Sequence, residues 1–368
     1  MNLGIVAASQ AHYADACDCF GRSLAVSREA GDRSGEAAAL MNLALVTLRQ
    51  GRLTEARERL GQALAIHTER ADREGVAAAT INLGIVFRQE GRLAEARDCF
   101  ERGLTACREI GHRLFEANAT GNLGSVLEAQ GRFAEAREQF ERVVAIRREI
   151  ADRQGEARAI GNIGYVLCAL GRFDEAREHL GRALALAQEI GQREVEAHAR
   201  RDLGRAAWEQ GDAAEAERQY VACLTTADTV GYRHLAAAAH LALGGLRAVT
   251  RGGDAGREAL VAARDLASTL EIPGVETLAR CRLALLPGGD AGDALAAFAR
   301  HGDRLESEEG REARLLLWQA TGDREHLEEA KRLLDATLVN VPAEHRAAIR
   351  SIVRVNREIA EAAKEAGL

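Results

Sequence analysis

Three side chains that could bind a charged ligand share one face of a predicted helix. Arg201, Arg205 and Trp208 stand at positions i, i+4 and i+7 of the helix predicted over 193–210, so they form one stripe. A guanidinium can bind a carboxylate through two parallel hydrogen bonds, and an indole can stack on a guanidinium or receive an apolar ligand side chain. The stripe therefore predicts a contact with an acidic segment. The alternative is a solvated helix face with a partly buried tryptophan.

No residue pattern typical of an enzyme accompanies this stripe. The sequence has no HExxH, no GxSxG, no phosphate-binding loop and no dinucleotide fingerprint. Its seven cysteines form no CxxC pair and do not stand beside histidines at the spacing of a zinc site. We therefore expect no catalytic residues, no metal ion and no cofactor.

The composition limits the class of partner. Hydrophobic residues make up 47% of the 368 residues and charged residues 29%, as in a folded protein with a core. The net charge is −7 and no basic stretch stands out, which argues against a nucleic-acid partner. There is no signal peptide and no apolar run long enough to span a bilayer, so we expect a cytoplasmic protein without a membrane partner. The preference for Arg over Lys, with abundant Ala and Gly, indicates a bacterial genome of high GC content.

One phrase recurs in the sequence every 40 residues. Its copies are NLALVTLRQGRLTEA at 42–56, NLGIVFRQEGRLAEA at 82–96, NLGSVLEAQGRFAEA at 122–136 and NIGYVLCALGRFDEA at 162–176. Repetition at a fixed period of this length is the signature of stacked structural units. One such unit cannot bury its apolar side alone, so neighbouring units share a continuous core.

Each repeated column has a physical role in a pair of helices. Gly84 stands inside a helical pattern, where glycine costs about 1 kcal/mol against alanine, and this cost is tolerated where two helices approach closely. Gly91 suits the left-handed position that ends a helix, and Phe100 fills the space between helices. The columns predict two antiparallel helices per repeat, at about 74–90 and 93–110 in the second full repeat.

These columns resemble the tetratricopeptide repeat family: an Asn-Leu-Gly triplet, a Gly seven residues later, an Ala five after that and a large residue four further on. The 40-residue period is similar to the long form found in spindle-orientation adaptors, kinesin light chains and bacterial peptide-responsive regulators. The resemblance implies an all-α, right-handed superhelical solenoid of antiparallel helix pairs. We expect a regular array over 1–270 with a truncated first repeat, degenerate pairs over 271–341, and one capping helix over 342–368 with Arg354 on its solvated side.

In this family the first helix of each pair lines a concave groove, which implies a column of ligand-facing asparagines. The column consists of Asn42, Asn82, Asn122 and Asn162, and it ends in Asp202. An Asn amide both donates and accepts, so it can pair with a peptide backbone of any sequence. First helices about 8–10 Å apart match three residues of an extended peptide at ~3.3 Å each. The alternative is that Asn is common at this position for structural reasons, also in repeats without a ligand there.

The other groove columns change in character along the array. By the same resemblance, the first repeats present apolar side chains and the far end presents basic and aromatic ones: Met41, Leu45, Ile81 and Ile85, then Arg158, Tyr165, Arg201, Arg205 and Trp208. We therefore expect a protein or peptide ligand that is acidic at one end.

The start of the sequence carries a further expectation. Met1 stands several residues inside a first helix, so the array opens in mid-repeat. We expect a protein- or peptide-binding scaffold or sensor module that forms the C-terminal part of a larger bacterial signalling or regulatory protein. The alternative is a self-assembling module that forms homo-oligomers through its uncapped N-terminal edge.

Overall fold

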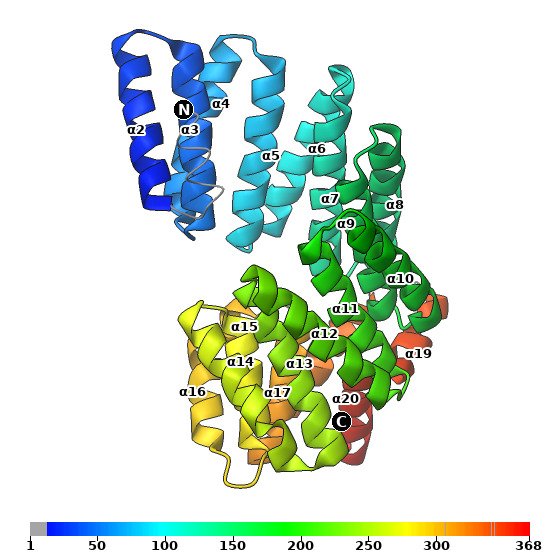
Figure 1. Cartoon of the computed structure of the whole chain (residues 1–368). Coiled ribbons are helices and arrows are strands. Elements are labelled where there is room, and N and C mark those ends of the chain that lie inside the picture. Colours follow the sequence, from blue (N-terminus) through cyan, green and yellow to red (C-terminus); the bar gives the residue numbers. More distant parts are fainter. Residues whose placement is uncertain (1–12, 306, 340, 342) are drawn as a thin grey trace. The chain divides into compact units, whose positions relative to one another are not determined.

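The computed structural model describes residues 13–305, 307–339, 341 and 343–368, and these form helices joined by short turns (Figure 1). No strand occurs within these ranges. The helices are α2 (Tyr13–Glu29), α3 (Arg33–Arg49), α4 (Leu53–Glu69), α5 (Arg73–Gln89), α6 (Leu93–Glu109), α7 (Arg113–Ala129), α8 (Phe133–Glu149), α9 (Arg153–Ala169), α10 (Phe173–Glu189), α11 (Arg193–Glu209), α12 (Ala213–Val230), α13 (Arg233–Arg251), α14 (Arg257–Thr269), α15 (Pro273–Ala284), α16 (Ala291–His301), α17 (Ser307–Thr321), α18 (Arg324–Val339), α19 (Ala343–Ile352) and α20 (Arg354–Glu365), with short 3-10 turns at Gly253–Gly256 and Gly302–Arg304.

The chain divides into two compact units, Met1–Val126 and Leu127–Leu368. Within each unit a helix packs on the next one along the chain, as in the pairs α3 with α4, α5 with α6, α9 with α10 and α11 with α12. The predicted all-α architecture of helix pairs is therefore confirmed. No helix of the described ranges combines the length and the apolarity that a membrane span requires. The predicted N-terminal edge falls largely on residues 1–12, which lie outside the described residues.

The turns follow from local sequence. Asp72 accepts a hydrogen bond from the backbone N–H of Gly75 at 3.0 Å and so caps the N-terminus of α5. Gly91 adopts φ +75°, the left-handed conformation that a side chain disfavours, at the end of the same helix. These two signals bound α5, and the limits of both α5 and α6 lie within one residue of the predicted ones.

The repeated glycines inside the first helices allow close packing, as predicted. A methyl group built on Gly84 would lie 2.6 Å from the ring of Phe100, which is fully buried. In the second unit, a methyl group on Gly164 would lie 2.5 Å from Cγ of Leu180. The absence of a side chain at these positions lets the large residue of the second helix reach the backbone of the first.

The predicted single capping helix over 342–368 is wrong. The chain forms α19 and α20, which are separated at Val353, whose backbone is extended with φ −70° and ψ +119°. Arg354 was expected on the solvated side, but it is largely buried, with 19% of its side chain exposed. Tertiary contacts explain the break, because Ile352 and Val353 pack against the turn at Gly171 and residues of α11 hold the start of α20.

One substitution made at two glycines tests the close-packing argument. Gly164→Ala should lower the free energy of unfolding by about 1–3 kcal/mol, because the new methyl group overlaps a buried leucine. Gly181→Ala, in α10, should instead raise it by up to ~1 kcal/mol, since nothing lies within 4 Å and alanine favours a helix. Urea unfolding followed by circular dichroism measures both. Equal effects of the two substitutions would contradict the argument.

Candidate functional site

The second unit contains a cavity of about 580 Å³ against the first helices of its repeats. Such a volume is typical of pockets that hold a small molecule or a short peptide segment. Residues of α9, α11 and α13 line it, together with residues of α15, α17 and the start of α20. All the candidate residues that belong to this unit lie on its wall: Arg158, Asn162, Tyr165, Arg201, Asp202, Arg205 and Trp208.

A row of polar groups on α9 faces the cavity without partners. Arg158, Asn162 and Tyr165 follow one another at i, i+4 and i+7, so they share one helix face. Among the described residues, none forms a hydrogen bond or an ion pair with the Arg158 guanidinium, the Asn162 amide or the Tyr165 hydroxyl. Gly161 leaves the helix backbone bare between them. This row can therefore donate and accept hydrogen bonds with a molecule in the cavity.

The basic residues of α11, by contrast, already have acidic partners. The Arg201 guanidinium lies 2.8 Å from the carboxylate of Asp202. Arg205 forms an ion pair with Glu308 at the start of α17, and its guanidinium lies 5.5 Å from the centre of the Tyr165 ring. The two guanidiniums that the sequence predicts for an acidic ligand are thus neutralised within the unit.

The helix that carries Glu308, α17, packs into the core of the second unit. Ala313, Leu316 and Leu317 of α17 are buried in one cluster with Leu278 and Cys281 of α15. A second ion pair joins Glu312 of α17 to Arg282 of α15, and both groups line the cavity. The carboxylates of Glu308 and Glu312 are thus presented to the cavity by a helix that packs in the core.

The start of α20 closes the cavity beside Trp208. The guanidinium of Arg354 lies 4.4 Å from the centre of the Trp208 ring, and the backbone N–H of Arg354 donates to the Glu209 carboxylate at 2.7 Å. Burial raises the pKa of Glu209 above its ordinary value.

Sequence reasoning missed Glu209, Glu308, Glu312 and Arg354 as cavity residues. The i, i+4 spacing of Glu308 and Glu312 is visible in the sequence, but nothing local shows that it faces Arg205, which lies 103 residues away.

The candidates of the first unit mainly support helix packing. Ile81 is buried, and its Cγ1 would lie 2.6 Å from a methyl group on Gly103. Contrary to the expectation from the sequence, Ile81 is therefore not available to a ligand. Met41 and Ile85 pack against the core cluster around Leu60. Leu45 is the exposed member of the apolar set, with 38% of its surface accessible.

The asparagine column is divided between the units. Asn42, Asn82 and Asn122 stand on α3, α5 and α7 of the first unit and are partly exposed. The Asn122 amide donates to the backbone carbonyl of Asn118 at 2.9 Å. Asn162, and Asp202 at the end of the column, line the cavity.

Thiol and imidazole groups show no sign of activation. Burial raises the pKa of Cys107 to about 11 and that of Cys168 to about 12, so both remain protonated at neutral pH and are poor nucleophiles. His198 lines the cavity, where burial and the nearby Arg201 guanidinium lower its pKa. The described ranges hold no group of three or more His, Cys, Asp or Glu side chains that could bind a metal ion.

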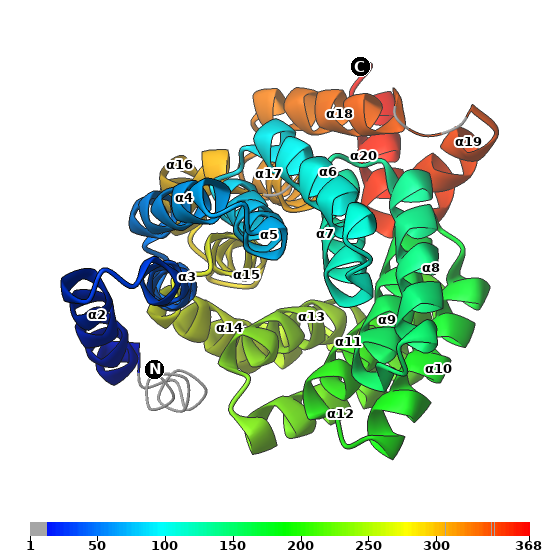
Figure 2. The same ribbon diagram turned by 90° about the horizontal axis from the view of Figure 1, so that it is seen from above.

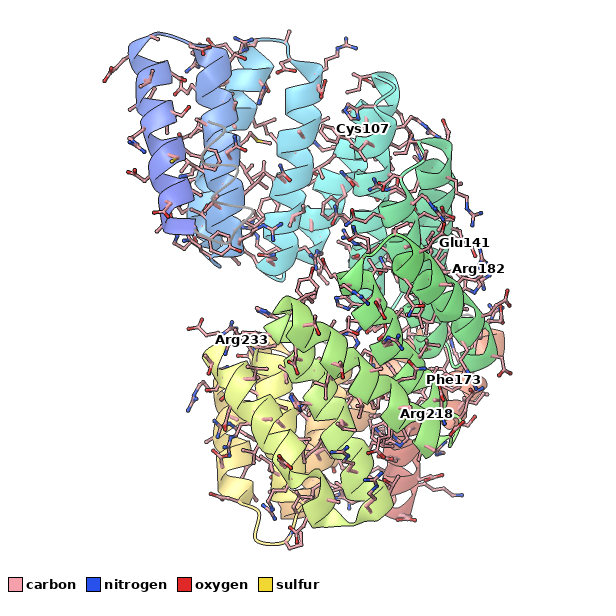
Figure 3. All side chains as sticks on the ribbon, viewed as in Figure 1. Cys107, Glu141, Phe173, Arg182, Arg218 and Arg233 are labelled. Atoms are coloured by element: carbon pink, nitrogen blue, oxygen red, sulfur yellow. The ribbon has the colours of Figure 1, made fainter. Side chains whose placement is uncertain are left out.

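The second helices of the repeats carry the solvated face. Figure 3 shows Glu141, Arg182 and Arg218, which project from α8, α10 and α12, and all three are exposed. Arg182 forms no ion pair with any described residue. The outer face thus offers basic residues that have no relation to the cavity, which makes them suitable controls.

Comparison with solved structures places this arrangement among known folds. A Rap protein complexed with Competence and Sporulation Factor aligns over 96% of this chain and 99% of its own, at 14% identity and a TM-score of 0.61. The Rap conjugation gene regulator of the plasmid pLS20, in complex with a Phr peptide, aligns over 94% and 97%, at 9% identity and a TM-score of 0.62. A STAND protein with a tetratricopeptide repeat sensor from Pyrococcus horikoshii aligns over 86% of this chain and 44% of its own, at 15% identity and a TM-score of 0.56. At these identities the likeness is one of fold.

Comparison at the level of sequence gives the family. No curated protein matches the chain. The family model of the tetratricopeptide repeat matches residues 1–69, 75–149 and 155–229. Because these matches cover more than half of the sequence, and the structure consists of consecutive helix pairs, the chain belongs to the tetratricopeptide repeat family.

Proposed function

We propose that the chain is a non-catalytic module that binds a short peptide segment in the cavity of its second unit. The observation that carries the proposal is the row of Arg158, Asn162 and Tyr165, whose polar groups face a cavity of about 580 Å³ without partners in the described structure. The Asn162 and Tyr165 side chains are half-buried, and polar groups in such places are normally paired, so the lack of partners for them favours an external ligand. The cavity has room for a few residues of an extended peptide. A helix is about 10–12 Å across with its side chains, so an extended segment fits the cavity better than a helix does.

The similar structures support a peptide as the ligand. One is a Rap protein complexed with Competence and Sporulation Factor, and another is a Rap regulator in complex with a Phr peptide. A third contains a tetratricopeptide repeat sensor in a STAND protein. By analogy of fold we assign the module to a bacterial signalling or regulatory protein that acts in the cytoplasm, and we expect it to report the presence of its ligand.

In this proposal, Arg158 is the residue that binds an acidic group of the ligand. Asp202 and Glu308 already neutralise Arg201 and Arg205, so a ligand carboxylate would have to displace an anchored partner. Arg158 is exposed to the cavity and has no carboxylate partner in the described ranges. An acidic group of the peptide would therefore meet Arg158, while the Asn162 amide pairs with the peptide backbone.

The asparagine contact can be tested with a matched pair of variants. Peptides that bind the purified chain are selected from a synthetic pool of random octapeptides, and their affinities are measured by calorimetry. Asn162→Leu should weaken binding about tenfold, because two hydrogen bonds worth roughly 0.5–1.5 kcal/mol each are lost. Asn82→Leu, at the same repeat position in the first unit, should bind like the wild type. Failure to enrich any peptide, or equal losses in the two variants, would refute peptide binding at this cavity.

Substitution of two arginines should have different effects, one mainly on stability and the other mainly on binding. Arg205→Ala should lower the free energy of unfolding by about 2 kcal/mol, because Glu308 loses its partner in a partly buried site. Arg158→Ala should leave stability within ~0.5 kcal/mol of the wild type and weaken the selected peptides, more so at low salt. Urea unfolding and calorimetry at two salt concentrations measure these effects. Arg182→Ala on the outer face is the control, and an Arg158→Ala variant that binds as tightly as this control would show that Arg158 is only solvated surface.

A further inference from the structure

The last helix begins without a cap of its own. Val353 precedes α20 and offers no side-chain hydrogen bond to the first turn. The first N–H groups of a helix need acceptors from elsewhere, and a carboxylate there also interacts favourably with the helix dipole. Glu209 of α11 supplies this carboxylate to the N–H of Arg354, from 145 residues away. A residue of the cavity wall thus holds the N-terminus of α20.

The Arg354 side chain makes a second contact with the same place on α11. Its guanidinium lies 4.4 Å from the centre of the Trp208 ring and is paired with Glu358 at 3.0 Å. Its Nε is buried and has no hydrogen-bond partner. Trp208, Glu209, Arg354 and Val355 all line the cavity. A ligand that fills this end of the cavity therefore touches α11 and α20 together.

The C-terminal helices contact two turns near the start of the second unit. A methyl group built on Gly171, in the turn after α9, would lie 3.3 Å from Cγ2 of Ile352. One built on Gly131, in the turn before α8, would lie 3.3 Å from Cγ2 of Thr337 on α18. Figure 2 shows α20 next to α18 and α19, with which it packs. The C-terminal helices thus close the second unit around its cavity, although α20 itself packs mainly on α18 and α19.

We propose that α19 and α20 form a latch, fastened to α11 through Glu209, Trp208 and Arg354, whose docking is linked to occupancy of the cavity. The link to a ligand rests on the proposed function, but the fastening itself does not. A ligand that contacts both α11 and α20 binds the docked state better and shifts the chain toward it. By the reciprocity of linked equilibria, a variant that loosens the latch must weaken the ligand by the same factor. The position of α20 would then report binding to other parts of a signalling protein.

Hydrogen exchange of the full chain without ligand tests the fastening. Glu209→Gln removes the charge from the cap, and amides of 343–365 should exchange roughly tenfold faster. Amides of α14, at 257–269, should keep their wild-type rates. Glu178→Gln, an exposed glutamate of α10, is the matched control, and Arg354→Gln is a second variant that leaves the backbone N–H in place but removes the contact with Trp208. Unchanged exchange in both latch variants, or an equal rise in α14, would overturn the latch.

Ligand binding tests the link. The octapeptides selected on the wild type should slow exchange of 343–365 in the wild-type chain and should bind Glu209→Gln roughly tenfold more weakly than Glu178→Gln. Peptides that bind at Asn162 but leave exchange of α20 unchanged would overturn the link and keep the proposed function. If no peptide binds at all, the proposed function fails, while the exchange of the unliganded variants still decides whether the latch exists.

Discussion

Close approach of the two helices in each repeat is the constraint on which the rest of the structure depends. It requires a position without a side chain on the first helix and a large residue opposite, as at Gly204 and Tyr220, where a methyl group would lie 2.6 Å from the ring. Glycine in a helix costs about 1 kcal/mol, and burial of the large residue offsets this by roughly 1.5–3 kcal/mol. With the second helix pressed against one side of the first, the remaining side of each first helix is left to line the interior. The cavity wall formed by α9, α11 and α13 follows from this arrangement.

The charges inside the second unit show why a basic stripe is not by itself a binding site. Arg201, Arg205 and Arg282 line the cavity, and each is paired with a carboxylate of the same unit. A partly buried guanidinium left alone would be costly, so the fold places α17 with Glu308 and Glu312 opposite it. These pairs fix α17 against α11 and α15 and shape the cavity. The polar groups of α9 remain available, because no described residue forms a hydrogen bond or an ion pair with the Arg158 guanidinium, the Asn162 amide or the Tyr165 hydroxyl.

The C-terminal helices combine a structural and a functional role. In a helical solenoid the last helix must cover an apolar edge, and α20 does so with Ile359 and Ala363, which are buried. Its N-terminus also completes the cavity through Arg354 and Val355. A capping element that lines the binding site is well placed to respond to the ligand, because one set of contacts stabilises both the edge and the bound state.

The sequence by itself determined the elements that depend on local or periodic interactions. The 40-residue period, the left-handed Gly91 and the glycine and large-residue columns were sufficient to predict the helix pairs and the limits of α5 and α6, because capping, turn conformation and face periodicity act within a few residues. The resemblance to the repeat family also assigned Asn162, Tyr165 and Arg158 to the groove-lining side of a first helix. Only the tertiary structure decided which side chains remain available. Arg205 meets Glu308 across 103 residues, and the N–H of Arg354 meets Glu209 across 145, so no local pattern reveals either contact. The break at Val353 has the same origin: a helix continues through that residue on propensity alone, and contacts with α11 and the turn at Gly171 stop it.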